Sequence, residues 1–91
     1  MTQHSLTTLS NTTATRLTPN GIHSGMDITL QNVNETAYVY VGGEGVTSTN
    51  YGYRISPNNG IAFELAERDA LYAISDVNSS KVAVIKVGLE G

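Results

Sequence analysis

The imidazoles are the side chains best suited to catalysis or metal binding, and the sequence has two, His4 and His23. His23-Ser24 lies close to Asp27, which places a nucleophile, a base and a carboxylate near one another in sequence. No nucleophile-elbow motif surrounds Ser24, so this spacing does not favour covalent catalysis. The residue types leave a two-histidine metal site with Asp27 or Glu44 open. On balance we predict no catalytic, metal-binding or cofactor-binding residues.

A second set of candidate groups is acidic and comprises Glu64, Glu67 and Asp69. Two such carboxylates could serve a glycosidase, but they would have to flank a substrate cleft at a defined separation. A chain of this length has little volume for that cleft, and the alternation of its strand places Glu64 outward. The pattern therefore favours a solvated charged surface, with Arg68 pairing locally.

The glycine cluster Gly42-Gly43-Glu44-Gly45 invites comparison with a phosphate-binding loop. Such a loop requires a following lysine and a helix whose N-terminus faces the anion. Here Val46-Thr47-Ser48-Thr49 follows instead, so Gly42, Gly43 and Gly45 are predicted to form a structural turn or bulge. In Asn58-Asn59-Gly60, Asn59 and Gly60 are predicted to form a second turn, because both residue types tolerate positive φ.

Tyrosine supplies five of the six aromatic residues. These rings can pack across strands with their hydroxyls at the surface, or they can form a contact surface for another protein. They can also stack on sugars, in which case Tyr51, Tyr53 and Asn50 are the candidates. The predicted interface residues are Tyr38, Tyr40, Tyr51, Tyr53, Tyr72, Leu6 and Leu9.

Composition narrows the class of protein. The 91 residues are 40% hydrophobic and only 14% charged, and serine and threonine together number 19. Threonine favours strands, while serine and asparagine favour turns, so the composition predicts an all-β domain. The net charge of −3 with scattered cations argues against nucleic acid as a partner, and there is no cysteine and no apolar run that could span a membrane. Without a signal-peptide pattern, synthesis in a cytoplasm is the simplest expectation.

Short β-favouring segments recur every eight to twelve residues, which is typical of a sandwich or a small barrel. We predict a small antiparallel β-sandwich or barrel of six to eight short strands over residues 19–91. Residues 1–18 are rich in threonine and are predicted to form an extended N-terminal arm or a peripheral strand. The predicted strands cover residues 26–31, 38–41, 51–55, 61–65, 71–75 and 81–87.

The stretch from Val39 to Val87 resembles small β-rich virion proteins encoded among the structural genes of tailed bacteriophages and prophages. The matching motifs are Val39-Tyr40-Val41-Gly42-Gly43, Gly45-Val46-Thr47, Asn50-Tyr51-Gly52, Pro57, residues 61–65, Asp69-Ala70-Leu71-Tyr72-Ala73 and residues 81–87. These are strand and turn features, and the resemblance brings no catalytic residues with it. Asn58-Asn59-Gly60 departs from the expected Pro-Gly turn, and the first eighteen residues lie outside the likeness.

The resemblance implies a non-enzymatic capsid decoration protein, made in the host cytoplasm, that binds the major capsid protein on the virion surface. It also implies a homo-oligomer, with a trimer favoured. Such a trimer would bury tyrosine-rich strand faces or open sheet edges, and the arm could add a strand to a neighbour's sheet. The alternatives are a neck, tail or fibre component of the virion and a carbohydrate-binding β-sandwich module.

Overall fold

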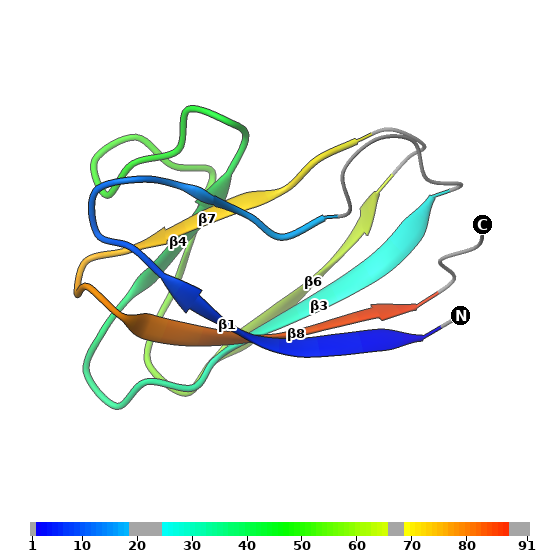
Figure 1. The fold of residues 1–91 in the computed structure, drawn as a ribbon, viewed down its shortest axis with the longest axis horizontal. Coiled ribbons are helices and arrows are strands. Elements are labelled where there is room, and N and C mark those ends of the chain that lie inside the picture. Colours follow the sequence, from blue (N-terminus) through cyan, green and yellow to red (C-terminus); the bar gives the residue numbers. More distant parts are fainter. Residues whose placement is uncertain (1, 19–24, 66–68, 88–91) are drawn as a thin grey trace.

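The computed structural model describes residues 2–18, 25–65 and 69–87, and all the regular structure in these residues is β-strand (Figure 1). The strands are β1 (Gln3–Leu9), β2 (Thr15–Arg16), β3 (Met26–Asn32), β4 (Val39–Gly42), β5 (Tyr53–Ile55), β6 (Gly60–Leu65), β7 (Tyr72–Ser75) and β8 (Ser80–Val87). They form two antiparallel sheets of four, ordered β1-β8-β3-β6 and β2-β7-β4-β5. The predicted all-β class is confirmed, with a sandwich-like arrangement of the two sheets.

Alternation of side chains explains how the first sheet divides into an inner and an outer face. Along β3, every second residue from Met26 to Asn32 is buried, and the residues between them are exposed. On β8, Val82 and Val84 are buried, whereas Ile85 points to the opposite, outer side. Because the side-chain period of a strand is two, this register puts one apolar row of each strand into the core.

The main core lies between the two sheets and is aliphatic. Ile28, Leu30 and Val82 from the first sheet pack in one cluster with Val39 and Val41 of β4. Each of these five side chains is almost completely buried. Burial of aliphatic side chains on this scale is the main force that holds a domain of this size together.

The N-terminal segment contributes to both sheets. β1 is an edge strand that pairs with β8 along its whole length, from Gln3 opposite Lys86 to Leu9 opposite Ser80. The short β2 then pairs with β7 of the other sheet. The sequence left an extended arm or a peripheral strand open for residues 1–18. Residues 3–9 form a peripheral strand, at the edge of the first sheet (Figure 1). The sequence Pro19-Asn20-Gly21, which is typical of a turn, lies outside the described residues, as do Glu67 and Arg68.

A buried asparagine links the two sheets at the end of β3. The Asn32 side chain is fully buried, and its Nδ2 donates to the carbonyls of Ala37 at 2.8 Å and Ile55 at 3.0 Å. Its Oδ1 accepts from the backbone N–H and the side-chain amide of Asn34. The Asn32 side chain therefore satisfies polar groups that a leucine at this position would leave without partners.

A turn forms at Asn58-Asn59-Gly60, where the sequence predicted one. The positive φ falls on Asn58, at 64°, and the Asn59 N–H donates to the carbonyl of Ser56. Gly60 is required for space instead, because a Cβ there would lie 2.8 Å from the carbonyl oxygen of Leu30 on β3. An asparagine thus takes the positive φ of this turn, and the close approach of two strands explains the glycine at position 60.

Candidate protein-contact surfaces

The outer face of the second sheet gathers most of the tyrosines, and we call it the tyrosine face. Tyr40 of β4 and Ile74 of β7 are buried there with Val46, and Tyr38 and Tyr72 pack against them half-buried. This cluster is separate from the main core. β4 is thus covered on both sides, by the main core at Val39 and Val41 and by this cluster at Tyr40.

The cover over the tyrosine face comes from the chain itself, through the loop of residues 43–52. The loop begins with a turn in which the Val46 N–H donates to the Gly43 carbonyl, and it returns to the sheet where the Gly52 N–H donates to Val41. Val46 is buried in the cluster, and the Tyr51 ring packs against Tyr40 at a tilt of 48°, with centroids 4.8 Å apart. Gly43 and Gly45 therefore lie in the turn of this loop, and Gly42 is the last residue of β4.

Two arginines complete the tyrosine face. The Arg54 guanidinium lies 4.9 Å from the Tyr38 ring centroid, and that of Arg16 lies 5.9 Å from the Tyr72 ring centroid. Both distances fall within the range of cation–π attraction. Burial raises the pKa of Tyr40 above the usual phenol value, the Asp76 carboxylate adds to this effect, and Arg54 opposes it. The face thus combines tyrosine rings with fixed positive charge.

The remaining predicted interface residues lie in three different places. Tyr53 is exposed on the edge strand β5, and Leu6 is exposed on the outer side of β1. Leu9 is almost fully buried in the main core, so its prediction as an interface residue was wrong. Side chains alternate between the two sides of β1. Leu9 lies on the side that faces the core, whereas Leu6 lies on the outer side.

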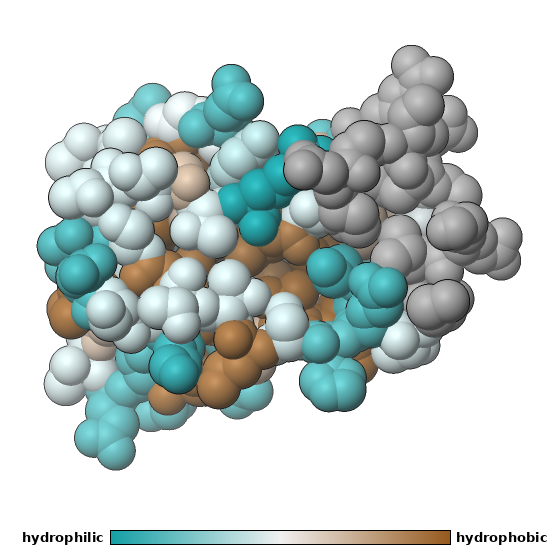
Figure 2. Space-filling view, in the orientation of Figure 1, coloured by the Kyte–Doolittle hydropathy of each residue, from teal (hydrophilic) through white to brown (hydrophobic). Residues whose placement is uncertain are grey.

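The outer face of the first sheet forms a second apolar surface, which we call the aliphatic face. Its large side chains are Leu6, Ile85 and Val87, which remain 57%, 40% and 42% exposed. In Figure 2, hydrophobic atoms gather in the lower middle of the view, close to where β1 and β8 cross in Figure 1.

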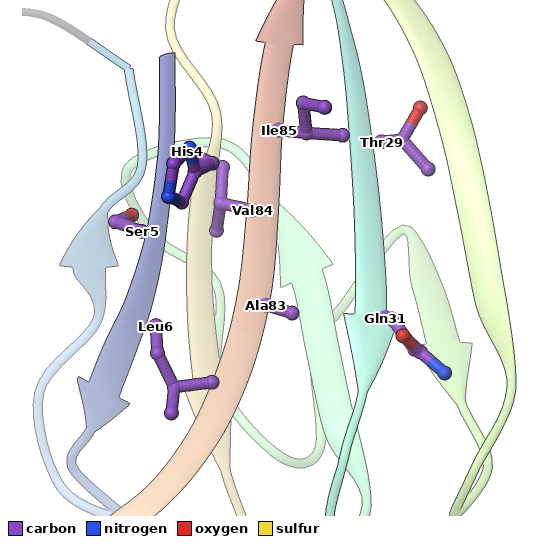
Figure 3. Close-up of a pocket in the computed structure, with 8 residues that line it drawn as sticks. All are labelled: His4, Ser5, Leu6, Thr29, Gln31, Ala83, Val84 and Ile85. Atoms are coloured by element: carbon purple, nitrogen blue, oxygen red, sulfur yellow. The ribbon is translucent and has the colours of Figure 1, made fainter.

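A shallow groove of about 330 Å³ crosses the aliphatic face (Figure 3). Leu6 of β1 reaches toward β8 in this view, and Ile85 of β8 reaches toward Thr29 of β3. The small side chain of Ala83 forms part of the groove between them. The lining is mostly apolar and holds few groups able to react with a ligand, so the groove suits packing against another surface.

A hollow of about 350 Å³ lies beside the loop at residues 43–52. Asn50 and Tyr51 line it together with Gly42 and Gly52. Asn50 is held in a tight turn, in which its N–H donates to Thr47 Oγ1 at 2.9 Å. Of the residues predicted for sugar binding, Asn50 and Tyr51 thus meet at one hollow, and Tyr53 does not line it.

The candidate catalytic and metal-binding side chains are dispersed where the structure describes them. His4 lies exposed on β1 opposite Ile85, and Glu64 lies exposed on β6 opposite Asp27. In residues 2–18, 25–65 and 69–87, no three histidine, aspartate or glutamate side chains are grouped as they would be around a metal ion. His23, Ser24 and Glu67 lie outside these ranges.

No helix in the described part of the chain is long and apolar enough to cross a membrane. Comparisons with protein-family models, with curated proteins and with solved structures found no match to this chain. The resemblance of residues 39–87 to phage virion proteins therefore stays an expectation from the sequence.

Several surface residues escaped prediction from the sequence. Ile85 and Val87 were recognised as one side of an alternating strand, but that side was not identified as solvent-exposed. The signal was present, because β8 is apolar on both sides and only one side can face the core of a two-layer sandwich. Nothing in the sequence indicated that Arg16 and Arg54 lie over tyrosine rings, because these positions depend on how the strands pair.

Proposed function

We propose that this chain is a non-enzymatic virion structural protein that decorates a bacteriophage capsid by binding the major capsid protein. The observation that carries the proposal is the tyrosine face, where three half-buried or buried tyrosines share one sheet surface with Arg16 and Arg54. Tyrosine and arginine are the residue types most enriched where protein contacts carry binding energy.

The construction of this face suits docking to a rigid surface. Tyr40 is held beneath Val46 and Tyr51, and cation–π contacts orient the rings of Tyr38 and Tyr72. Side chains that are already ordered lose little conformational entropy when a partner binds. A capsid subunit that covers this face would gain apolar contact with the rings and hydrogen bonds with the phenol and guanidinium groups.

The resemblance of residues 39–87 to phage virion proteins supports the same role, and it favours a position on the outside of the head. Self-association belongs to this proposal, with a trimer as the form that the resemblance favours. A neck, tail or fibre position would use the same adhesive chemistry with another virion partner.

The test is binding to undecorated capsids assembled from the major capsid protein encoded alongside this chain. We expect the wild-type protein to sediment with capsids, and we expect Arg54→Glu combined with Tyr38→Ala to weaken binding about tenfold or more, as loss of contact hot spots does. Asn78→Ala, in the exposed turn between β7 and β8 and outside both faces, serves as the control and should bind as the wild type does. Capsids that never retain the wild-type protein would refute the proposal.

Carbohydrate binding is a second candidate, favoured by the hollow at which Asn50 and Tyr51 meet. A tyrosine ring stacks on the apolar face of a sugar, and an asparagine side chain can both donate to and accept from its hydroxyls. A glycan array probed with the wild-type protein, and with Tyr51→Ala as the control, decides this candidate. Signals that disappear in the variant would support it, and an array without signals would remove it.

A further inference from the structure

The sizes and charges of the side chains on the aliphatic face indicate which kind of molecule can cover it. Its outer residues form cross-strand rows, in which Leu6 lies opposite Ala83 and His4 lies opposite Ile85. Large and small side chains therefore alternate over the groove, with Ala83 beside Leu6 and Ile85. Isolated surface hydrophobic residues need no explanation, but several that share one sheet face mark an interaction surface.

The two ends of the aliphatic face carry opposite charge. Lys81 lies at one end of β8, on the same side as Ala83 and Ile85. At the other end, Asp27 of β3 lies directly opposite Glu64 of β6 and directly opposite Val87 of β8. Two like charges in facing positions on neighbouring strands repel each other, and a cation placed over them would relieve that repulsion.

We propose that the aliphatic face binds a second copy of this chain, face to face, with the strands of the two β8 antiparallel across the contact. A two-fold axis in the plane of the contact and perpendicular to the strands exchanges the two ends of the face. It places Lys81 of each copy opposite Val87 of the other and beside Asp27, which lies one strand away on β3, at a spacing of about 4.8 Å. It also places Ala83 of each copy against Ile85 of the other, so that a small side chain receives a large one.

The charge pattern selects this orientation over the other two-fold arrangement. An axis parallel to the strands would set Lys81 of one copy against Lys81 of the other and would leave both acidic ends without a facing cation. Like charges brought together across an interface cost binding energy, so the antiparallel arrangement is favoured. Two twisted sheets pack in this aligned way about 10 Å apart in β-sandwiches.

The size of the face predicts a weak dimer. The outer residues of β8 from Lys81 to Val87 span about 20 Å, and four strands at about 4.8 Å spacing span about 19 Å. The contact then buries about 800 Å² in total, below the range of stable specific interfaces. We therefore expect a dimer that forms between micromolar and millimolar concentration, in contrast to the trimer that the family likeness favours.

Sedimentation equilibrium of the purified protein over that concentration range tests the proposal. We expect a monomer–dimer equilibrium in the wild type and a dissociation constant about tenfold or more higher for Ile85→Asp, which places a charge in the contact. Val77→Asp is the matched control, because Val77 is 50% exposed in the turn before β8 and lies outside the face. A wild type that stays monomeric up to millimolar concentration would overturn the proposal.

A charge exchange tests the orientation. The first variant is Lys81→Glu, and the second combines Asp27→Lys with Glu64→Lys. Each variant by itself should associate more weakly than the wild type, because it brings like charges together at both ends of the contact. An equimolar mixture of these two variants should form a dimer again, since every end then meets its opposite charge. Self-association of Lys81→Glu that is no weaker than that of the wild type would overturn the antiparallel arrangement and favour the parallel one, in which like charges face each other at position 81 in both proteins.

This inference uses the sheet opposite the tyrosine face and is measured without capsids. Its outcome is therefore separable from that of the proposed function. If the purified chain stays monomeric and Ile85→Asp abolishes capsid binding instead, the occupant of the aliphatic face is a capsid subunit, and the second-copy proposal fails.

Discussion

The two outer faces of the sandwich differ in what covers them. The tyrosine face has a second small core, in which Tyr40 and Ile74 are buried beneath Val46 of the loop at residues 43–52. The aliphatic face has no such cover among the described residues, and Leu6, Ile85 and Val87 stay exposed. The tyrosine face thus buries part of its apolar area within the chain, whereas the aliphatic face keeps apolar area that only another molecule can bury.

The difference shows that apolar residues on an outer strand face have two possible uses. On β4 the large Tyr40 is retained because the chain returns over it and gains the free energy of burying the ring. On β8 no loop returns over Ile85, so its apolar area is free to stabilise a contact between molecules. Substitutions that separate stability from association can test this distinction.

The largest expected effect concerns Asn32, which links the sheets beneath both faces. Asn32→Ala leaves the carbonyls of Ala37 and Ile55 and the N–H of Asn34 without their partner. At about 1–3 kcal/mol for each buried group, we expect a loss of about 4 kcal/mol in the free energy of unfolding. Urea denaturation followed by circular dichroism measures it. Asn78→Ala, in an exposed turn, is the control, and a loss below about 1 kcal/mol for Asn32→Ala would contradict the role of this link.

Truncation of one large side chain on each face compares the two directly. Tyr40→Ala should lower the free energy of unfolding by about 3 kcal/mol, because it removes a buried ring from a packed cluster. Ile85→Ala should lower it by less than about 1 kcal/mol, because much of that side chain is already in water. Equal losses, measured by urea denaturation of dilute protein, would mean that the faces do not differ in their contribution to folding.

The cover of the tyrosine face depends on Val46. Val46→Ala removes two buried methyl groups and should cost about 1.5 kcal/mol, at about 0.8 kcal/mol for each group. Because the loop is then held less firmly, the Gly52 N–H, which donates to Val41, should exchange with deuterium faster. Val77→Ala is the matched control on an exposed valine. Unchanged exchange at Gly52 would show that the loop holds its place without this side chain.

The smallest expected effect is the titration of Tyr40 at high pH. Burial and Asp76 raise the pKa of this phenol, so it stays protonated in the folded protein at a pH where the unfolded chain has begun to ionise. The stability that depends on the neutral phenol is complete below about pH 10 and is lost as the pH rises through the folded pKa. Absorbance titration of phenolate should show a late phase that Tyr40→Phe removes.

A second variant sharpens that titration. Arg54 lowers the pKa of Tyr40, so Arg54→Gln should move the late phase to still higher pH. A late phase that survives Tyr40→Phe would instead assign the raised pKa to another tyrosine.

Local pattern was sufficient to predict the fold class and most of the strands, but not β2. Alternation from Met26 to Gln31 identified a half-buried strand, because the period of two is a property of the extended backbone itself. The same kind of pattern placed Glu64 outward, as observed. The glycines at 42–45 were recognised as a turn because no lysine and no helix pattern follows them.

Tertiary structure decided which apolar residues became surface. The period of two puts Leu6 and Leu9 on opposite sides of a strand, but only the pairing of β1 with β8 sends Leu9 into the core and Leu6 outward. The return of residues 43–52 over Tyr40 is a tertiary contact between neighbouring segments, and the pairing of Asp27 with Glu64 joins segments that are far apart in sequence. Strand propensity is read over a few neighbouring residues, whereas a contact surface depends on which strands lie side by side.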